Sequence, residues 1–507
     1  MAATRFNAKK DTFVQCCSAV ETQFEQSLEK DFILPDYCPD IFRILKCRAY
    51  PRVISQSVNG DKASMELEAL IKVLYLSENS GRINVLEQKL SCTKTIDLPE
   101  DCRSPLIYAC PRVDYLNCRV ISPRRLDVRG AVTVRVNVVC ERKKEFISDA
   151  EGAGIQLRKS EVSYISERMA ASKRITMIEE LDLGEAKPAP AAIISTDCAA
   201  RAQEVKLVSG KAVCKGEIAL SVEYIPNEES ASGAAAEMMQ FAVPFSQVLD
   251  LEGVDESCEI SIDIVSAGCD IVSKSSDPRS LECEIVLIMN CTALRYKNAD
   301  AVTDAFSTQY ECECESGDFT IEGRREKSTE QLSLSGTLRY EDGNIASVCC
   351  CRCEAESFTV RDGTVSGTAL VTLIGMNGDG GAIYLENELP FEFEPDEGCE
   401  VTAVETGTLT YQLTSDNSAD IRAEVLLTVN RSSRSCPRPL TNITVSEEKL
   451  SDSRGSCALK LYRVGEGERL WDIAKKYKTS VKAIIEENEL GAETAENGGM
   501  LLIPLTN

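Results

Sequence analysis

The most informative gap in this 507-residue sequence is histidine, which is entirely absent. Without an imidazole, the chain cannot build a Ser-His-Asp or Cys-His catalytic arrangement, a His-ligated zinc site or the usual proton shuttle near neutral pH. Catalysis would have to rest on carboxylates, Lys or Cys, and no carboxylate pair lies in a recognisable acid-base arrangement. We therefore expect a protein that is not an enzyme, with no catalytic residues, no metal and no cofactor.

Positive charge and long apolar runs are also scarce. The 56 Lys and Arg face 81 Asp and Glu, so the net charge is −25, which argues against binding to nucleic acid or anionic lipid. No run approaches the ~18 apolar residues of a membrane-spanning helix, and the first residues lead into no apolar stretch typical of a signal peptide. We expect neither membrane insertion nor export.

The acidity is unevenly distributed. Residues 301–430 carry seven Lys and Arg against 25 Asp and Glu, a net charge of −18. Such a surface is either simply solvated or a docking face for a basic partner, and the first interpretation is favoured.

Cysteine, by contrast, is abundant, with 24 residues. Without export, we expect most of them to be free thiols. Two pairs, Cys312 with Cys314 and Cys351 with Cys353, have the spacing that places both members on one face of a strand. Four such thiolates could bind zinc, but the sequence has no pair of Cys-x-x-Cys motifs, the pattern typical of structural zinc sites. Burial as small apolar side chains is favoured, and oxidative cross-linking is a third hypothesis.

Two blocks about 150 residues apart share a pattern. In each, a proline is followed five residues later by an aliphatic pair, and then by an alternating segment that ends in tyrosine. The prolines are Pro39 and Pro188, the pairs are Ile44-Leu45 and Ile193-Ile194, and the segments are 67–75 and 218–224. A third alternating segment, 365–374, resembles the second but lacks an obvious proline block. The chain therefore contains a repeated unit.

Alternation of apolar and polar residues predicts β-strands throughout most of the chain, separated by Gly, Asn, Asp and Pro turns. We therefore predict a mainly β protein with three tandem β-sandwich or barrel-like modules. The predicted organisation is an N-terminal extension (1–27), module 1 (28–140), a charged and partly helical connector (141–177), module 2 (178–296), an acidic and divergent module 3 (305–430), a flexible linker (431–457) and a small C-terminal domain (458–507).

The pattern of the last fifty residues is different. A short alternating segment, 459–464, precedes a Gly-rich turn. Residues 470–477 then form an amphipathic stripe, and Thr479 or Ser480 could cap a second helix at 481–488. A closing strand is expected at 498–504, so the predicted order is β-α-α-β.

At these positions the segment resembles a LysM domain. The residues that match the family pattern are Tyr462, Val464, Gly467, Leu470, Trp471, Ile473, Ala474, Asn488, Gly499, Leu502, Ile503 and Pro504. LysM domains that hold N-acetylglucosamine polymers use the loops that correspond here to 465–470 and 488–491. The family's Asp-Thr after the turn glycine is Glu468-Arg469 in this chain.

The whole chain resembles the SipL-like spore coat morphogenetic proteins, in which tandem SPOCS domains precede a LysM domain. The resemblance rests on Leu34-Pro-Asp-Tyr-Cys-Pro-Asp-Ile41, on the two proline blocks and on the C-terminal domain. It implies a non-enzymatic protein of the mother-cell cytoplasm and forespore surface that tethers coat layers. Its LysM domain would bind a SpoIVA-type coat ATPase, and its modules would contact other coat proteins or self-associate.

For the LysM domain we expect partner recognition on solvent-facing polar residues of the turn and helices. These are Glu466, Gly467, Glu468, Arg469, Lys475, Lys476 and Asn488. The alternative function is binding of peptidoglycan or chitin at the cell envelope. A cell-wall hydrolase with a LysM targeting module is a further alternative, which the missing histidine disfavours.

Overall fold

The computed structural model describes residues 6–77, 82–227, 234–274, 276–361, 363–450, 458–465, 467–491 and 499–505. Nearly all described residues up to 450 belong to strands, and the two helices of the described ranges follow after that point. The predicted mainly β fold is confirmed. Within the same ranges, neither helix is long and apolar enough to cross a membrane.

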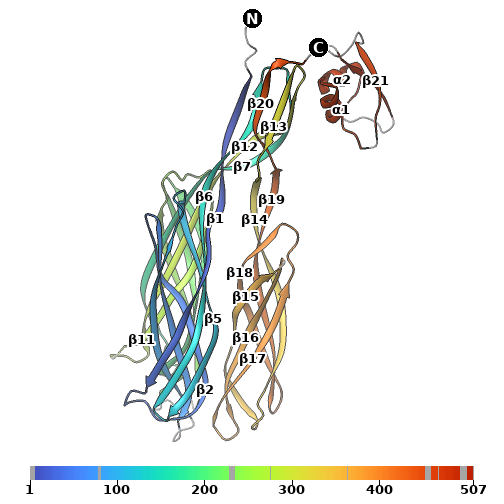
Figure 1. Ribbon diagram of the computed structural model, residues 1–507. Coiled ribbons are helices and arrows are strands. Elements are labelled where there is room, and N and C mark those ends of the chain that lie inside the picture. Colours follow the sequence, from blue (N-terminus) through green and yellow to red (C-terminus); the bar gives the residue numbers. More distant parts are fainter. Residues whose placement is uncertain are drawn as a thin grey trace.

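Three modules with the same strand order make up the chain from residue 7 to residue 449 (Figure 1). Module 1 contains β1 (Asn7–Ile33), β2 (Ile41–Asn59), β3 (Lys62–Ser77), β4 (Ile83–Asp97), β5 (Arg103–Ser122) and β6 (Arg125–Glu151). Module 2 contains β7 (Ile155–Asp182), β8 (Pro190–Val208), β9 (Lys211–Pro226), β10 (Glu237–Asp250), β11 (Glu259–Ser273) and β12 (Ser280–Ser307). Module 3 contains β13 (Tyr310–Ser316), β14 (Thr320–Arg339), β15 (Ile345–Arg361), β16 (Thr364–Asn377), β17 (Ala382–Phe393), β18 (Cys399–Ser415), β19 (Ser418–Pro437) and β20 (Leu440–Lys449).

In each module, the first and last strands pair with each other, and the second to fourth strands form a separate sheet. The first sheets have the orders β1-β6-β5, β7-β12-β11 and β14-β19-β18, and the second sheets are β2-β3-β4, β8-β9-β10 and β15-β16-β17. In module 3 the first and last strands are each divided, so that β13 pairs with β20 beyond β14 and β19. The two sheets of each module pack face to face as a sandwich.

The cores follow from the alternation seen in the sequence. Along β6, β9 and β19, every second side chain turns inward because successive residues of a strand point to opposite faces. The central strand β19, for example, buries Ile421, Ala423, Val425 and Leu427 against the second sheet of module 3. Apolar burial on these faces is the main stabilising contribution to each sandwich.

The longest strands extend beyond the sandwiches and form a stalk at one end of the molecule (Figure 1). Three two-stranded ribbons meet there: the β1–β6 ends, the β7–β12 ends and β13–β20. Their inward side chains form two small apolar clusters, one around Phe13, Phe146 and Tyr164 and the other around Ile147 and Val302. We call this region, residues 7–17, 141–165, 296–316 and 440–449, the stalk.

The stalk replaces three segments for which the sequence suggested little regular structure. The expected N-terminal extension (1–27) is largely β1, and the expected connector (141–177) belongs to β6 and β7, with no helix in it. The expected flexible linker (431–457) contains the end of β19 and all of β20, while residues 451–457 lie outside the described ranges. The amino-acid composition of these segments did not indicate strands, because each strand is stabilised by backbone hydrogen bonds to a strand far away in sequence.

The aliphatic pairs of the repeat have separate roles in the structure. Ile44, Ile193 and their counterpart Val348 face the core of their own modules. The residue that follows each of them sits at a register shift, a β-bulge. These bulged residues, Leu45, Ile194 and Cys349, all join one apolar cluster where the second sheets of the three modules meet.

Buried and half-buried charged groups meet at the same junction. The Arg48 guanidinium of module 1 and the Arg352 guanidinium of module 3 both pair with Glu354, at 2.7 and 2.8 Å. Arg352 also donates to Ser195 Oγ of module 2 at 2.5 Å, and Ser195 donates to Glu223, whose residue is 6% exposed. One polar network therefore links all three modules, and it is satisfied except for Nε of Arg352 among the described atoms.

A tyrosine anchors the proline block in two of the modules. The Tyr75 hydroxyl donates to the carbonyl of Pro39 at 3.1 Å, and the Tyr224 hydroxyl donates to the carbonyl of Pro188 at 3.0 Å. The register places Gly375 at the matching position of module 3, where a Cβ would lie 2.4 Å from the Ser347 carbonyl oxygen. A tyrosine does not fit there, which explains why the third repeat is weak in sequence.

We predict that Tyr75→Phe and Tyr224→Phe each lower the free energy of unfolding by about 1–2 kcal/mol, because each leaves a proline carbonyl without its donor. Urea unfolding followed by circular dichroism measures the effect. The matched control is Tyr115→Phe, since Tyr115 is 54% exposed and its change should stay within about 0.5 kcal/mol. Equal midpoints for all three variants would contradict the anchoring role.

Candidate functional site

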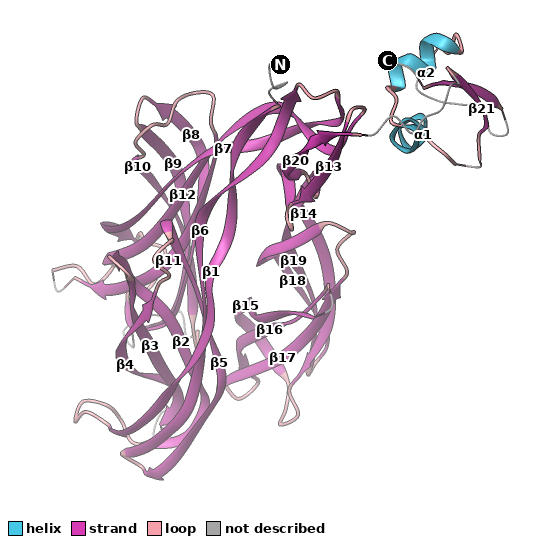
Figure 2. Ribbon diagram, turned by 45° about the horizontal axis from the view of Figure 1, so that its top comes forward, coloured by secondary structure: helices cyan, strands magenta, loops and turns pink. Residues whose placement is uncertain are grey.

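The C-terminal domain is a compact unit, here called the head, that lies beside the stalk (Figures 1 and 2). It consists of β21 (Leu459–Arg463), α1 (Leu470–Tyr477), α2 (Val481–Glu487) and β22 (Met500–Pro504), in the predicted order. The predicted helical stripe provides its core, with Leu470, Ile473 and Ala474 fully buried. Ser480 caps α2 by accepting a hydrogen bond from the Ala483 amide at 3.1 Å.

Glu468 closes the turn that leads into α1. Its carboxylate accepts hydrogen bonds from the Gly465 amide at 2.9 Å and from the Tyr462 hydroxyl at 2.7 Å. The backbone donor and then the tyrosine hydroxyl lower the pKa of Glu468 by stabilising the charged form. This side chain therefore shapes the turn, and Gly467 provides the positive φ of 74° that the turn requires.

Asn488 joins the end of α2 to the closing strand. Its side-chain amide donates to the carbonyls of Ile484 and Leu502 at 2.8 and 2.7 Å, and its carbonyl accepts from the Leu502 amide at 2.7 Å. Three of the four hydrogen-bonding positions of this side chain, including both donors, are thus used within the head.

Helix α1 docks the head on the stalk. The indole Nε1 of Trp471 donates to Asp304 Oδ2 at 2.7 Å, and Lys475 Nζ pairs with Asp304 Oδ1 at 2.6 Å. The ring of Phe306 meets the Trp471 ring edge to face, with centroids 5.0 Å apart. Phe306 is 2% exposed and belongs to the core cluster of the head. A strand of module 2 therefore contributes an anchor to the C-terminal domain.

The remaining cations of the predicted site lie on other faces of the head. Lys476 is exposed, with its ammonium 5.2 Å from the centre of the Tyr462 ring. Arg469 is exposed at the N-cap of α1, where its side chain makes no capping bond. Glu466 lies outside the described residues. The predicted residues thus have different roles. Glu468 and Asn488 make hydrogen bonds within the head, Lys475 contacts Asp304 of the stalk, and Arg469 and Lys476 are exposed to solvent.

The contact of α1 with Asp304 and Phe306, here called the dock, was not predicted from the sequence. Asp304 and Phe306 lie about 170 residues before Trp471 and Lys475, and neither stands in a motif. The available signal was the indole N–H of the single tryptophan, which requires an acceptor when it is partly buried.

The two cysteine pairs singled out in the sequence lie in different parts of the molecule. Cys312 and Cys314 have sulfurs 3.9 Å apart in the stalk, whereas Cys351 and Cys353 border the core of module 3. No group of three or more ligating side chains with metal-site geometry occurs among the described residues. The 22 cysteines that the structure describes are all free thiols.

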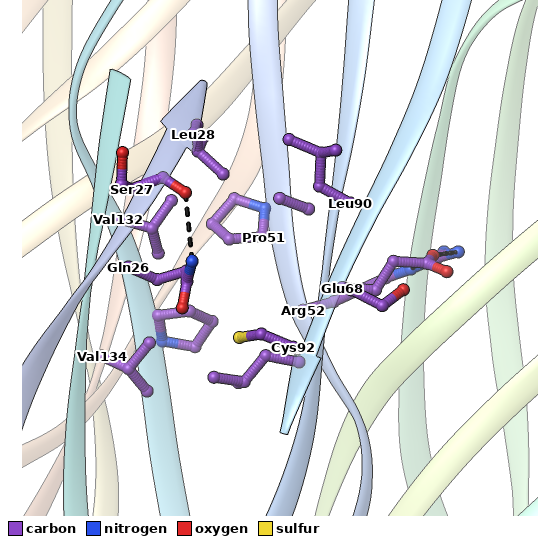
Figure 3. A pocket seen from close by; sticks show the side chains of 14 residues that line it. Gln26, Ser27, Leu28, Pro51, Arg52, Glu68, Leu90, Cys92, Val132 and Val134 are labelled. Carbon is purple, nitrogen blue, oxygen red and sulfur yellow. Dashed lines mark hydrogen bonds and ion pairs between the residues drawn. The ribbon is translucent and has the colours of Figure 1, made fainter. Parts of the chain in front are cut away.

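A pocket inside module 1 is too small for a substrate. It lies between the two sheets, near Leu28, Pro51, Cys92 and Val134, with the Arg52–Glu68 ion pair at its margin (Figure 3). Its volume is about 30 Å³, which is room for about one water molecule.

Comparisons with known proteins agree with the division of the chain into β modules and a C-terminal head. A family model described as the SipL SPOCS domain matches residues 191–272, within module 2. A second, described as the LysM domain, matches residues 462–504, which is the head. No curated protein and no solved structure matched the chain.

The SPOCS match covers the strands from β8 to β11, and modules 1 and 3 repeat the topology of the module that contains it. The LysM match includes the turn, both helices and the closing strand. Neither domain family is catalytic. The chain therefore carries a SipL-type SPOCS domain and a LysM domain, the combination of a coat-related sporulation protein.

Proposed function

We propose that this protein is a non-enzymatic tether of the spore coat whose LysM head binds a SpoIVA-type coat ATPase at the forespore surface, in the mother-cell cytoplasm. The observation that carries the proposal is the union, in one chain, of a SPOCS domain and a LysM domain. The three sandwiches act as a scaffold that presents the head from the stalk.

The turn of the head favours a protein partner over a glycan. LysM domains that hold N-acetylglucosamine polymers are expected to bind them with loops corresponding to 465–470 and 488–491. Here the Gly465 amide already donates to Glu468, and Asn488 is occupied by β22 and α2. A glycan acetamide would have to displace these bonds, and each displaced internal bond costs affinity.

The exposed cations of the head suit an acidic or polar protein surface. Arg469 and Lys476 are open to solvent and lie beside the turn at 465–468. We assign partner recognition to this surface, together with Gly467 of the turn; Glu466, which lies outside the described residues, stays a predicted recognition residue. Glu468 and Asn488 hold its shape, and Lys475 has its main contact in the dock.

Partner capture tests the proposal. Immobilised full-length protein should retain a purified SpoIVA-type ATPase, and insoluble peptidoglycan or chitin should not sediment the protein. Arg469→Glu with Lys476→Glu should weaken the ATPase complex by roughly tenfold or more, about 1.4 kcal/mol, because recognition cations become repulsive. Biolayer interferometry measures the affinity of the parent chain and of the double variant for the ATPase.

The matched control is Lys482→Glu, because Lys482 is an exposed lysine on the other helix of the head, with its side chain 84% exposed. Its affinity should stay within about twofold of the parent chain. Sedimentation with peptidoglycan that is lost when 458–507 is deleted, without capture of the ATPase, would replace this function by the glycan-binding alternative.

The dock makes a separate prediction. Asp304→Ala removes the acceptor for Trp471 and the partner of Lys475, so the emission of the single tryptophan should shift to longer wavelength and become easier to quench with acrylamide. Asp300→Ala, on the same strand and exposed, serves as the control. Identical spectra for both variants would show that the head does not rest on Asp304 in solution.

A further inference from the structure

An apolar patch lies at the end of module 1 that is farthest from the stalk. Its largest exposed side chains are Tyr37 (87%), Ile33 (76%) and Phe42 (66%), and Ile121 (49%) and Val120 (39%) lie at the adjoining end of β5. They lie in or beside the β1–β2 and β5–β6 turns, which are joined by backbone bonds such as Leu34 N to Arg124 O at 2.9 Å. We call these five residues the tip patch.

The fold of the turn does not require these side chains. Module 2 has the same turn, with the matching bond from Leu183 N to Arg279 O and the same tyrosine-to-proline anchor. Yet the residues that correspond to Tyr37 and Phe42, 149 positions later, are Ala186 and Ala191. The repeat thus provides an internal control: two alanines are sufficient for the structure, so the two rings serve another purpose.

Guanidinium groups outnumber carboxylates at the patch, four (Arg43, Arg119, Arg124 and Arg125) to three (Asp31, Asp36 and Asp40). Asp31 is paired with Arg125 at 2.6 Å, and Arg124 is shared by Asp40 at 2.7 Å and Asp36 at 3.9 Å. Two further guanidinium groups, of Arg43 and Arg119, are exposed at the patch, and within the described part of the chain neither has an ion-pair partner. The surface is therefore apolar with a basic rim, on a chain whose net charge is −25.

The complementary surface is the same end of module 3. The turns there expose the carboxylates of Glu341, Asp342, Asp379 and Asp416, and none of these four is ion-paired among the described residues. Leu413 and Tyr411 of β18 are exposed beside them, at 43% and 47%. We call this set the acidic tip.

We propose that two copies of this chain dimerise end to end, with the tip patch of each seated on the acidic tip of the other. The tip patch and the acidic tip lie at the same end of the molecule, opposite the stalk (Figure 1). One two-fold rotation therefore places each opposite its complement, so a single pairing forms two equal contacts and closes the assembly. The heads remain at the two outer ends.

Analytical ultracentrifugation of the full-length protein tests the proposal. The parent chain should sediment as a concentration-dependent dimer that weakens as salt is added. Tyr37→Ala with Phe42→Ala, which installs the residues of module 2, should weaken dimerisation by roughly tenfold or more. Val208→Ala, at an exposed valine away from this end, is the control and should leave the dimer intact.

Exchanging the charges of the two surfaces tests whether the tip patch of one copy contacts the acidic tip of the other. Arg43→Glu with Arg119→Glu, and Glu341→Lys with Asp342→Lys, should each give a monomer when alone, and an equimolar mixture of the two should dimerise. A monomer at every concentration, a dimer insensitive to these changes, or assemblies that grow beyond two chains would overturn the proposal. The head is unchanged in all variants, so capture of the ATPase can fail or succeed independently of this result.

Discussion

The pairing of the first and last strand in each module is the constraint on which the architecture depends. Because β1 pairs with β6 and β7 with β12 in antiparallel fashion, the chain enters and leaves each module at the same end. Only residues 152–154 and 308–309 connect the modules, too few to lead the chain to the opposite end. Successive modules must therefore lie side by side, with their paired ends gathered into the stalk.

That arrangement creates a second requirement at the junction of the second sheets. Sandwiches side by side could slide, and the β-bulges at Leu45, Ile194 and Cys349 prevent this by directing one side chain from each module into a common apolar cluster. The ion pairs of Glu354 with Arg352 and Arg48 restrict the relative orientation of modules 1 and 3. A charge that is largely removed from water destabilises the protein unless its partner lies within reach. The junction fixes the modules relative to one another and thereby keeps their far ends aligned.

The sequence predicted features whose cause is local or periodic, and it missed those whose cause is distant. Alternation located the central strands, and the motif around Leu470, Trp471 and Ile473 was sufficient for the head. The repeated proline and aliphatic pair located two modules, whereas Gly375 obscured the third. Residues 141–177 and 431–449 were misjudged because their charged or Ser-rich strands are stabilised by ladders to remote partners. The dock at Asp304 depends on folding of the whole chain and was invisible to local reasoning.

The two ends of the molecule differ in chemistry, and each end needs residues from more than one module. This explains why the protein has three modules although one could be joined to the head. A single sandwich could present a LysM domain, but the dock requires Asp304 and Phe306 of module 2, and the ribbon next to it comes from module 3. The opposite end needs the basic apolar turn of module 1 and the acidic turns of module 3 at one level. Three copies of one fold, held in register by the stalk and the junction, supply both ends at once, and in the proposed dimer the acidic turns of the third copy face the basic rim of the first.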